Sequence, residues 1–234
     1  MGISYSGIYA IANKFPSIIN TMYNFFYMAW KESSAKVVKE KNSAQYYNSI
    51  YKQLNNFLIA VTIMLLAFMP FIFPILIKNE YVEAYQYIPL LLFAIYFSNI
   101  SSFYGGIFAA YKNTKVMGLS TVVSAILNVV INLALIKFIG LYAAILSTFV
   151  SMFIVFLYRK KKIKEYVTLE KTGYLWYSIL VCAILTFIYY SNNLIIILFG
   201  ALLGTLYSIY INRDMIASMK NLVKEKVRKK RVKA

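Results

Sequence analysis

Long apolar stretches alternate with short polar segments along almost the whole chain. A helix that crosses a membrane needs about 20 mostly apolar residues, because the hydrocarbon core of a bilayer is about 30 Å thick. Seven stretches come close to this length, and their polar breaks include two tight turns at residues 137–140 and 191–192. We therefore predict seven spans, at residues 5–30, 54–77, 87–110, 117–137, 138–158, 174–190 and 193–212.

The composition agrees with this pattern. The chain is 61% hydrophobic and has a mean hydropathy of +0.63, whereas soluble domains carry roughly 45–50% apolar residues. A soluble protein of this length would not need so many apolar residues, so lipid must surround much of the apolar surface of this chain. We predict an all-α polytopic membrane protein, with a helical lobe at 1–212 and a basic tail at 213–234.

The basic residues are distributed very unevenly among the predicted loops. One set of alternating segments carries 22 Lys and Arg, and the other set carries only Lys78 and Lys137. The basic segments are 31–52, 111–116, 159–172 and the tail. Lys and Arg accumulate in cytoplasmic loops. We therefore expect a multi-pass protein of the plasma (inner) membrane with a cytoplasmic C-terminus.

This topology places the first residues, MGISYSG, outside the cell. The chain enters its first predicted span at once, with no basic segment and no signal-peptide cleavage site before it. Nothing in the sequence would hold the first helix in this orientation. We therefore expect missing upstream spans, with this chain as the C-terminal part of a larger protein, either a fragment or a split gene product.

Two basic segments are expected to lie on the membrane surface. The tail places apolar residues on one helical face among many cations, which is typical of a helix bound to anionic lipid and not of a nucleic-acid-binding segment. These residues are Met215, Met219, Leu222 and Val223. The loop 31–52 is expected to lie on the surface in the same way. Its interfacial residues would be Val38, Tyr46, Tyr47 and Ile50.

The residue inventory argues against catalysis. There is no His, and the single cysteine, Cys182, lies in an apolar run, so His-based chemistry, a His-ligated metal and a disulfide framework are excluded within the chain. All eight acidic residues lie outside the predicted spans, and Glu80 and Glu83 are the only ones on the outer side. We read them as residues of a solvated turn, and we expect no enzyme activity, metal or cofactor.

Lys14 is the one cation in the interior of a predicted span, since Lys137 stands at the end of its span, and ionisable residues in a membrane are functional candidates. In one reading its side chain extends to the outer interface. In the other, which we favour, it faces a water-filled cavity and pairs with an anion, because it lies about 14 Å into the span at 1.5 Å per residue. Asn13, Asn20 and Asn24 share a broad helical face, and with Lys14 they form our candidate substrate-binding set.

Other polar and small residues inside the spans favour packing roles. Asn128 and Asn132 are four residues apart and share a helix face, and we expect them to hydrogen-bond between helices. The pairs Gly105–Gly106 and Gly200/Gly204 are typical of close contact between helices.

One part of the sequence resembles a known family. In AILNVVINLALIKFIGLYAAILSTFVS, two Asn four apart end one helix, a short Gly turn follows, and small residues open the next helix. The matching positions are Asn128, Asn132, Gly140, Ala143, Ala144, Ser147 and Thr148. This pattern resembles the Wzx-like polysaccharide and oligosaccharide-lipid flippases of the multidrug/oligosaccharidyl-lipid/polysaccharide exporter superfamily. Tyr142 departs from the pattern, where a small residue is usual. The opening GIYAIANKFPSIINTMYNFFYMAW also looks like the eighth helix of these proteins.

The resemblance extends over essentially the whole chain and implies one lobe of a two-lobed, MATE-like transporter. It further implies flipping of an undecaprenyl-diphosphate-linked oligosaccharide for surface polysaccharide synthesis. The partners would be this lipid-linked oligosaccharide, membrane lipids, and a missing N-terminal lobe or a second copy, with no nucleic acid. The alternatives are a drug/cation antiporter of the same superfamily, or a membrane enzyme of polysaccharide assembly such as a polymerase.

Overall fold

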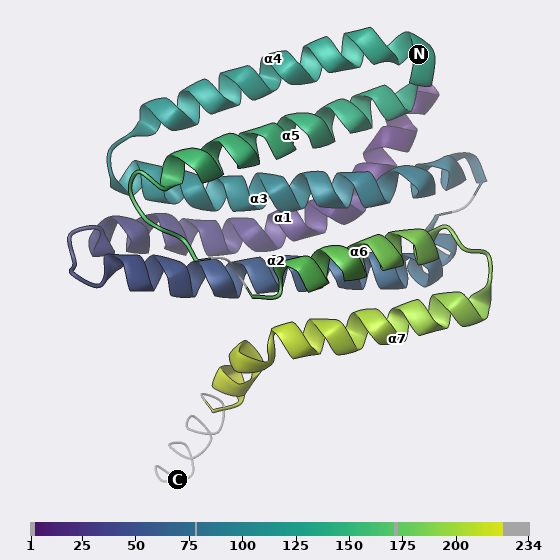
Figure 1. Cartoon of the computed structure of the whole chain (residues 1–234). Coiled ribbons are helices and arrows are strands. Elements are labelled where there is room, and N and C mark those ends of the chain that lie inside the picture. The colour runs from purple at the N-terminus through teal and green to yellow at the C-terminus, as the bar shows by residue number, and fades with distance from the viewer. Residues whose placement is uncertain (1–2, 78, 171–172, 222–234) are drawn as a thin grey trace, which may run out of the picture.

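The computed structural model describes residues 3–77, 79–170 and 173–221, which form helices and no strand. The long helices are α1 (Ile3–Val37), α2 (Ser43–Leu76), α3 (Ile88–Ala110), α4 (Thr114–Ile139), α5 (Leu141–Ile163), α6 (Leu175–Tyr189) and α7 (Leu194–Ile211). A 3₁₀ segment, η1 (Asn79–Tyr87), leads into α3. Consecutive helices run in roughly opposite directions in one elongated bundle (Figure 1). Because the described residues form helices and no strand, the prediction of an all-α chain is confirmed.

Five segments of the described chain are long and apolar enough to cross a membrane: α2, Glu80–Ala110, α4, α5 and α7. They correspond to five of the seven predicted spans. The sixth, 174–190, becomes α6, which is apolar but only 15 residues long. The first, 5–30, lies within α1, which is 35 residues long but is not among the segments apolar enough by themselves. The chain is thus a multi-pass membrane protein by length and composition.

The connections gather at two opposite ends of the bundle (Figure 1). The α1–α2, α3–α4 and α5–α6 connections lie at the end from which the C-terminal segment leaves α7. These connections, together with the helix ends beside them, carry most of the lysines of the described residues, and we call this end the basic end. Lys78, Lys171 and the tail beyond residue 221 lie outside the described residues, so the predicted surface positions Leu222 and Val223 are not described.

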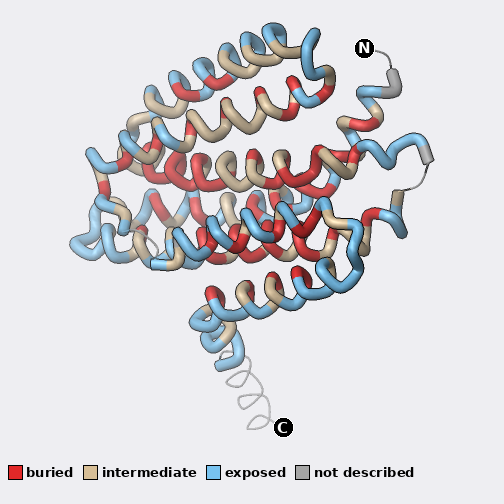
Figure 2. Tube along the Cα trace, turned by 45° about the vertical axis from the view of Figure 1, so that its right-hand side comes forward, coloured by how far each residue is buried: buried red, intermediate tan, exposed pale blue. Residues whose placement is uncertain are grey.

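Helix α3 lies at the centre of the larger half of the bundle and packs against α1 and α5. Trp30 of α1 is 2% exposed, and its ring stacks on Phe103 of α3 with 4.3 Å between centroids. The Trp30 indole N–H also donates to the Phe103 carbonyl over 3.1 Å. Burial is concentrated in these central helices, whereas α4 is largely exposed (Figure 2).

In the smaller half of the bundle, α2 packs against α6 and α7, and polar contacts near the basic end join α2 to the end of α7. The Asn56 amide donates to the Ile211 carbonyl over 2.9 Å, and the Asn212 amide donates to the Asn56 carbonyl over 3.3 Å. Both asparagines are buried. These contacts fix α7 beside α2.

The predicted surface segment at 31–52 is wrong in its main feature. Helices α1 and α2 extend through most of it, so that only residues 38–42 separate them. Tyr47 is fully buried and donates to the Ser34 carbonyl over 2.9 Å. Tyr46 and Ile50 are half-buried against the core, and Val38 is half-buried. The two helices pack on each other here, so these rings fill the space between helices.

The small residues act as predicted. A β-carbon at Gly106 would lie 2.7 Å from Trp30 Cδ1, and one at Gly204 would lie 2.9 Å from the Ala67 β-carbon of α2. The turn between α4 and α5 consists of Gly140 alone, with φ 57° and ψ −131°. Side chains make this conformation costly, which explains why glycine stands at the turn.

Candidate ligand-binding surface

Helix α1 has three different faces along its length. One face is buried against the bundle and contains Ile8, Ala12, Phe15, Ile19, Tyr23 and Trp30. A second face is exposed and apolar, and contains Ile18, Met22 and Phe25. The third face carries polar side chains that are half-buried or exposed: Asn13, Lys14, Ser17, Asn20, Thr21 and Asn24. We call this third face the polar stripe.

The structure brings the predicted site residues onto the polar stripe but does not enclose them. Asn13 and Asn20 are half-buried, whereas Lys14 and Asn24 are exposed. At 3.6 residues per turn, the three asparagines lie nearly in line and Lys14 lies at the edge of the stripe. Within the described chain, their side-chain amides and the Lys14 amine form no hydrogen bond or ion pair with another side chain.

The hydroxyl groups of the stripe, in contrast, bond to their own helix. Ser17 donates to the Lys14 carbonyl over 2.6 Å, and Thr21 donates to the Ser17 carbonyl over 3.0 Å. The groups that remain available are therefore the amides and one ammonium. Amides both donate and accept hydrogen bonds, and an ammonium offers three donors and a positive charge.

A second cation lies deep in the bundle at a position that the sequence analysis assigned to the basic loop 159–172. Arg159 of α5 is 7% exposed. It donates to Ser120 Oγ (2.9 Å), the Ser101 carbonyl (3.0 Å), Thr121 Oγ1 (3.2 Å) and the Met117 carbonyl (3.3 Å). All four acceptors are neutral, so the charge of this guanidinium is not compensated by a contacting carboxylate.

The ion pairs among the described residues do not include Arg159. They join Lys36 to Glu32, Lys162 to Glu165 and Arg213 to Asp214, all on partly or largely exposed side chains. The buried region around Arg159 thus has a net positive charge. Such a charge attracts anions over a longer range inside an apolar bundle than it does in water.

The region between α1 and Arg159 is also polar. The phenols of Tyr23 and Tyr27 lie close enough to interact electrostatically with the guanidinium. The Tyr23 hydroxyl is buried without a hydrogen-bond partner. On α3, the half-buried Ser98 and Ser102 lie between the face that contacts Trp30 and the face that contacts Arg159. A polar surface therefore continues from the stripe across α3 towards α5.

Sequence reasoning missed Arg159 because three lysines follow it and the run looks like a loop. The helical period contained a signal. Ser151, Val155 and Arg159 are spaced four residues apart and therefore share one face, and all three are buried. A basic residue that continues the phase of a buried face is a candidate for the bundle interior.

The predicted interhelical role of the α4 asparagines is confirmed for one of them. The Asn128 amide donates to Thr148 Oγ1 over 3.3 Å and to Ser151 Oγ over 3.4 Å, both on α5. The Asn132 side-chain oxygen is buried without a partner. Asn128 therefore joins α4 to α5, whereas no hydrogen bond among the described residues gives Asn132 this role.

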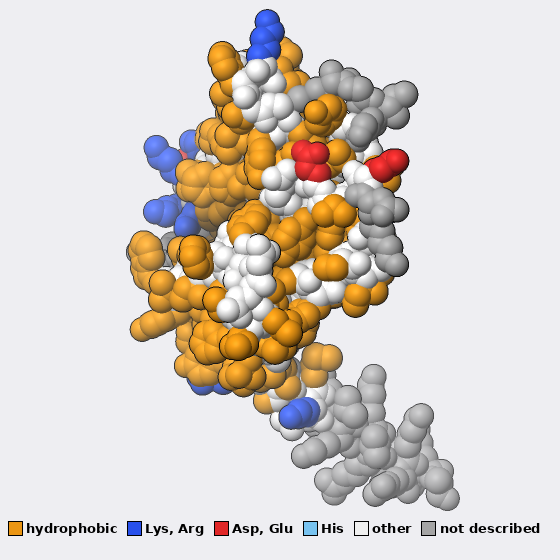
Figure 3. Space-filling model, turned by 90° about the vertical axis from the view of Figure 1, so that its right-hand side faces the viewer, with side chains coloured by type: hydrophobic (Ala, Val, Ile, Leu, Met, Phe, Trp, Pro, Cys, Tyr) orange, Lys and Arg blue, Asp and Glu red, His pale blue; other side chains and the backbone are white. Residues whose placement is uncertain are grey.

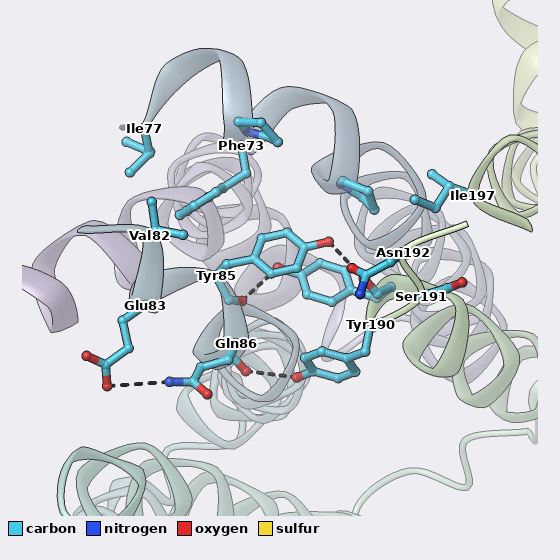
Figure 4. Close-up of a pocket in the computed structure, with 13 residues that line it drawn as sticks. Phe73, Ile77, Val82, Glu83, Tyr85, Gln86, Tyr190, Ser191, Asn192 and Ile197 are labelled. Atoms are coloured by element: carbon cyan, nitrogen blue, oxygen red, sulfur yellow. Dashed lines mark hydrogen bonds between the residues drawn. The ribbon is translucent and has the colours of Figure 1, made fainter. Parts of the chain in front are cut away.

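A pocket of about 930 Å³ lies at the end opposite the basic end, between η1, α2 and the α6–α7 turn (Figure 4). Tyr85 and Tyr189 stack at 4.2 Å and each hydroxyl donates to the other's carbonyl over 2.8 Å. Glu83 accepts hydrogen bonds from Tyr87 (2.7 Å) and Gln86 (3.4 Å).

Figure 3 shows this end, where acidic side chains lie among apolar and uncharged ones. Among the described residues that line the pocket, Glu83 is the one carboxylate, and no group of metal-ligating side chains occurs in the described part of the chain. The polar stripe, with Lys14 and its asparagine amides, is our candidate site.

Comparisons of the chain with protein-family models, with curated proteins and with solved structures return no match.

Proposed function

We propose that this chain is part of a transporter that moves an undecaprenyl-diphosphate-linked oligosaccharide across the plasma membrane for surface polysaccharide synthesis. The observation that carries the proposal is the polar stripe of α1, where Lys14 and three asparagine amides are free to bind a ligand. The resemblance to Wzx-like flippases supplies the identity of the cargo.

The chemistry of the stripe fits the two parts of such a cargo. A diphosphate and a hydrated sugar are both excluded from hydrocarbon, because burying charged and polar groups without partners is costly. Lys14 offers an ammonium for the phosphate oxygens. Asn13, Asn20 and Asn24 offer amides, which can donate to and accept from sugar hydroxyls.

Arg159 supports an anionic cargo through its charge. Arg159 lies in the last turns of α5, so the cost of about 2.5–3.5 kcal/mol for an Arg at the centre of a membrane helix is an upper limit for it. Its four hydrogen bonds contribute roughly 0.6–2 kcal/mol each, which together offsets that cost. Since no carboxylate contacts Arg159 among the described residues, we assign it the role of a positioning residue whose positive charge makes the surface attractive to phosphate.

The same charges disfavour the rival functions. Lys14 and Arg159 would repel a cationic drug, and the polar stripe has no carboxylate of its own for coupling to protons or cations. A polymerase or another enzyme would need acids and bases close together, and Glu83 is the one carboxylate among the described residues that line the outer pocket. Both lines of reasoning favour transport of an anion.

The polar stripe is exposed along a helix of a membrane bundle, which lipid chains cannot cover favourably. We infer that a second lobe or a second copy of this chain covers it, so that the ligand binds between the two. Rocking of two such halves about the site is a common mechanism of transporters. In this arrangement the basic end faces the cytoplasm.

The proposal can be tested with the purified full chain in proteoliposomes that contain a fluorescent polyprenyl-diphosphate oligosaccharide. A membrane-impermeant quencher reports how fast the lipid reaches the outer leaflet. We expect the chain to accelerate this step and Lys14→Ala to slow it. Arg159→Met should also slow it while the unfolding temperature changes little, because Ser120 and Thr121 keep their other hydrogen bonds.

Lys112→Ala provides the matched control, since Lys112 is an exposed cation in the α3–α4 connection and should be without effect. Equal rates for the wild-type chain and for protein-free vesicles would contradict flipping by this chain. Efflux of a lipophilic cation driven by an imposed pH gradient would favour the antiporter instead.

A further inference from the structure

A groove runs between α5 and α6, where α3 passes between them (Figure 1). It has a volume of about 690 Å³ and is lined by α2, α3, α5 and α6. One wall consists of four phenyl rings, each of which contacts at least one of the others: Phe97, Phe149, Phe153 and Phe156. The other wall is α6, with Ile179, Cys182 and Ala183. This groove is separate from the polar stripe.

The polar side chains in the groove use their hydrogen bonds inside the protein. Thr62 donates to the Leu58 carbonyl over 2.8 Å, and Thr186 donates to the Cys182 carbonyl over 2.7 Å. The Tyr96 hydroxyl donates to the Asn55 side-chain oxygen over 2.7 Å. The groove therefore presents mainly carbon to whatever fills it, which suits a hydrocarbon ligand.

One end of the groove carries a cation. The Lys160 amine lies 5.2 Å from the centroid of the Phe156 ring, near the basic end of α5. Phe149 lies at the other end, and the helix between them is about 16 Å long at 1.5 Å per residue. This is close to half of the ~30 Å hydrocarbon core. The groove therefore has the depth of one leaflet, with its charge at the headgroup end.

From this geometry we propose that the groove binds one acyl chain of an anionic bilayer phospholipid, with the lipid phosphate at Lys160. A long polyprenyl chain would extend far beyond one leaflet. The proposal does not depend on the flipping of a lipid-linked oligosaccharide.

The test uses the full chain, purified in mild detergent and equilibrated with equal amounts of phosphatidylcholine and phosphatidylglycerol. Native mass spectrometry then counts the retained lipids. We expect phosphatidylglycerol to be retained preferentially. Lys160→Gln should weaken its retention about fivefold, which corresponds to the ~1 kcal/mol contributed by a Lys near anionic lipid. Lys161→Gln is the control, because Lys161 is exposed and does not line the groove.

Filling the groove tests the site of the acyl chain. Ala183→Trp should abolish retention, and Ile179→Trp should do the same from one turn away. Leu198→Trp, on the exposed face of α7, is the matched control and should retain lipid normally. Circular dichroism of each variant checks that the bundle is intact.

Three results would overturn the proposal. They are equal retention of the two phospholipids, unchanged retention in Ala183→Trp and Ile179→Trp, or displacement of phosphatidylglycerol by an equal amount of a polyprenyl phosphate. The last result would assign the groove to an isoprenoid chain.

Discussion

Replacing Gly106 by alanine tests the contact between α1 and α3 that organises the larger half of the bundle. A β-carbon at this position would lie 2.7 Å from Trp30 Cδ1 and closer still to Trp30 Nε1. Trp30 is 2% exposed and cannot move without disturbing its neighbours. The substitution should therefore push the indole ring out of its place.

The expected loss of stability follows from the contacts that Trp30 would lose. Overpacking a well-packed core costs typically 1–3 kcal/mol. The hydrogen bond from Trp30 to the Phe103 carbonyl contributes about 1 kcal/mol, and the stacked ring pair contributes about 0.5–1.5 kcal/mol. Alanine gains up to about 1 kcal/mol over glycine in helix propensity. We expect a net loss of about 2–4 kcal/mol in the free energy of unfolding.

The assay is denaturant unfolding of the purified full chain in detergent, followed by circular dichroism. In a Trp176→Phe background, Trp30 is the only tryptophan, so a red shift of its emission reports displacement of the ring directly. Gly118→Ala is the control, because a β-carbon there meets no other atom within 4 Å. It should leave stability unchanged or raise it slightly.

A second mutation separates the clash from other effects of alanine. Trp30→Leu removes the ring that the new methyl group would meet, so Gly106→Ala should cost much less in that background. Coupling of this kind is expected only between residues in contact. If Gly106→Ala were as stable as Gly118→Ala, or if the two mutations were additive, the described packing of α1 on α3 would be refuted.

Three further substitutions test other parts of the fold by the same unfolding assay. Gly140→Ala should cost about 1–3 kcal/mol, because a side chain at φ 57° and ψ −131° is strained; no loss would mean that the α4–α5 turn has another conformation. Asn128→Leu should cost less than about 1 kcal/mol, since its two bonds are long and polar contacts between membrane helices average about 0.6 kcal/mol; a loss several times larger would contradict this weak role. Tyr189→Phe should cost about 1 kcal/mol by removing the bond to the Tyr85 carbonyl while the stacked rings remain, and an unchanged stability would show that this bond contributes nothing.

The sequence by itself determined the class of protein and the positions of most helices. Five predicted spans coincide with apolar helices long enough to cross a membrane, and the basic connections lie at one end of the bundle. The close packing at Gly106 and the contact of Asn128 with α5 were also predicted. These properties depend on local composition, helical period and residue size, all of which can be read along one segment.

Only the tertiary structure decided which face of each helix is buried. Tyr47 was predicted at the membrane interface, but the structure places it in the core, because α1 and α2 continue past their apolar stretches and pack on each other. The structure also buries Arg159 among α3, α4 and α5, although neighbouring lysines made it look like part of a loop.

The candidate site also combines features that the sequence predicted with features that only the tertiary structure shows. The helical period predicted that Asn13, Asn20 and Asn24 share a face, and they do share the polar stripe. The tertiary structure added the unpaired Tyr23 hydroxyl on α1 and the buried charge of Arg159, which contacts α3 and α4. Such juxtapositions arise between residues far apart in the chain, so the spacing within a single helix contains no information about them.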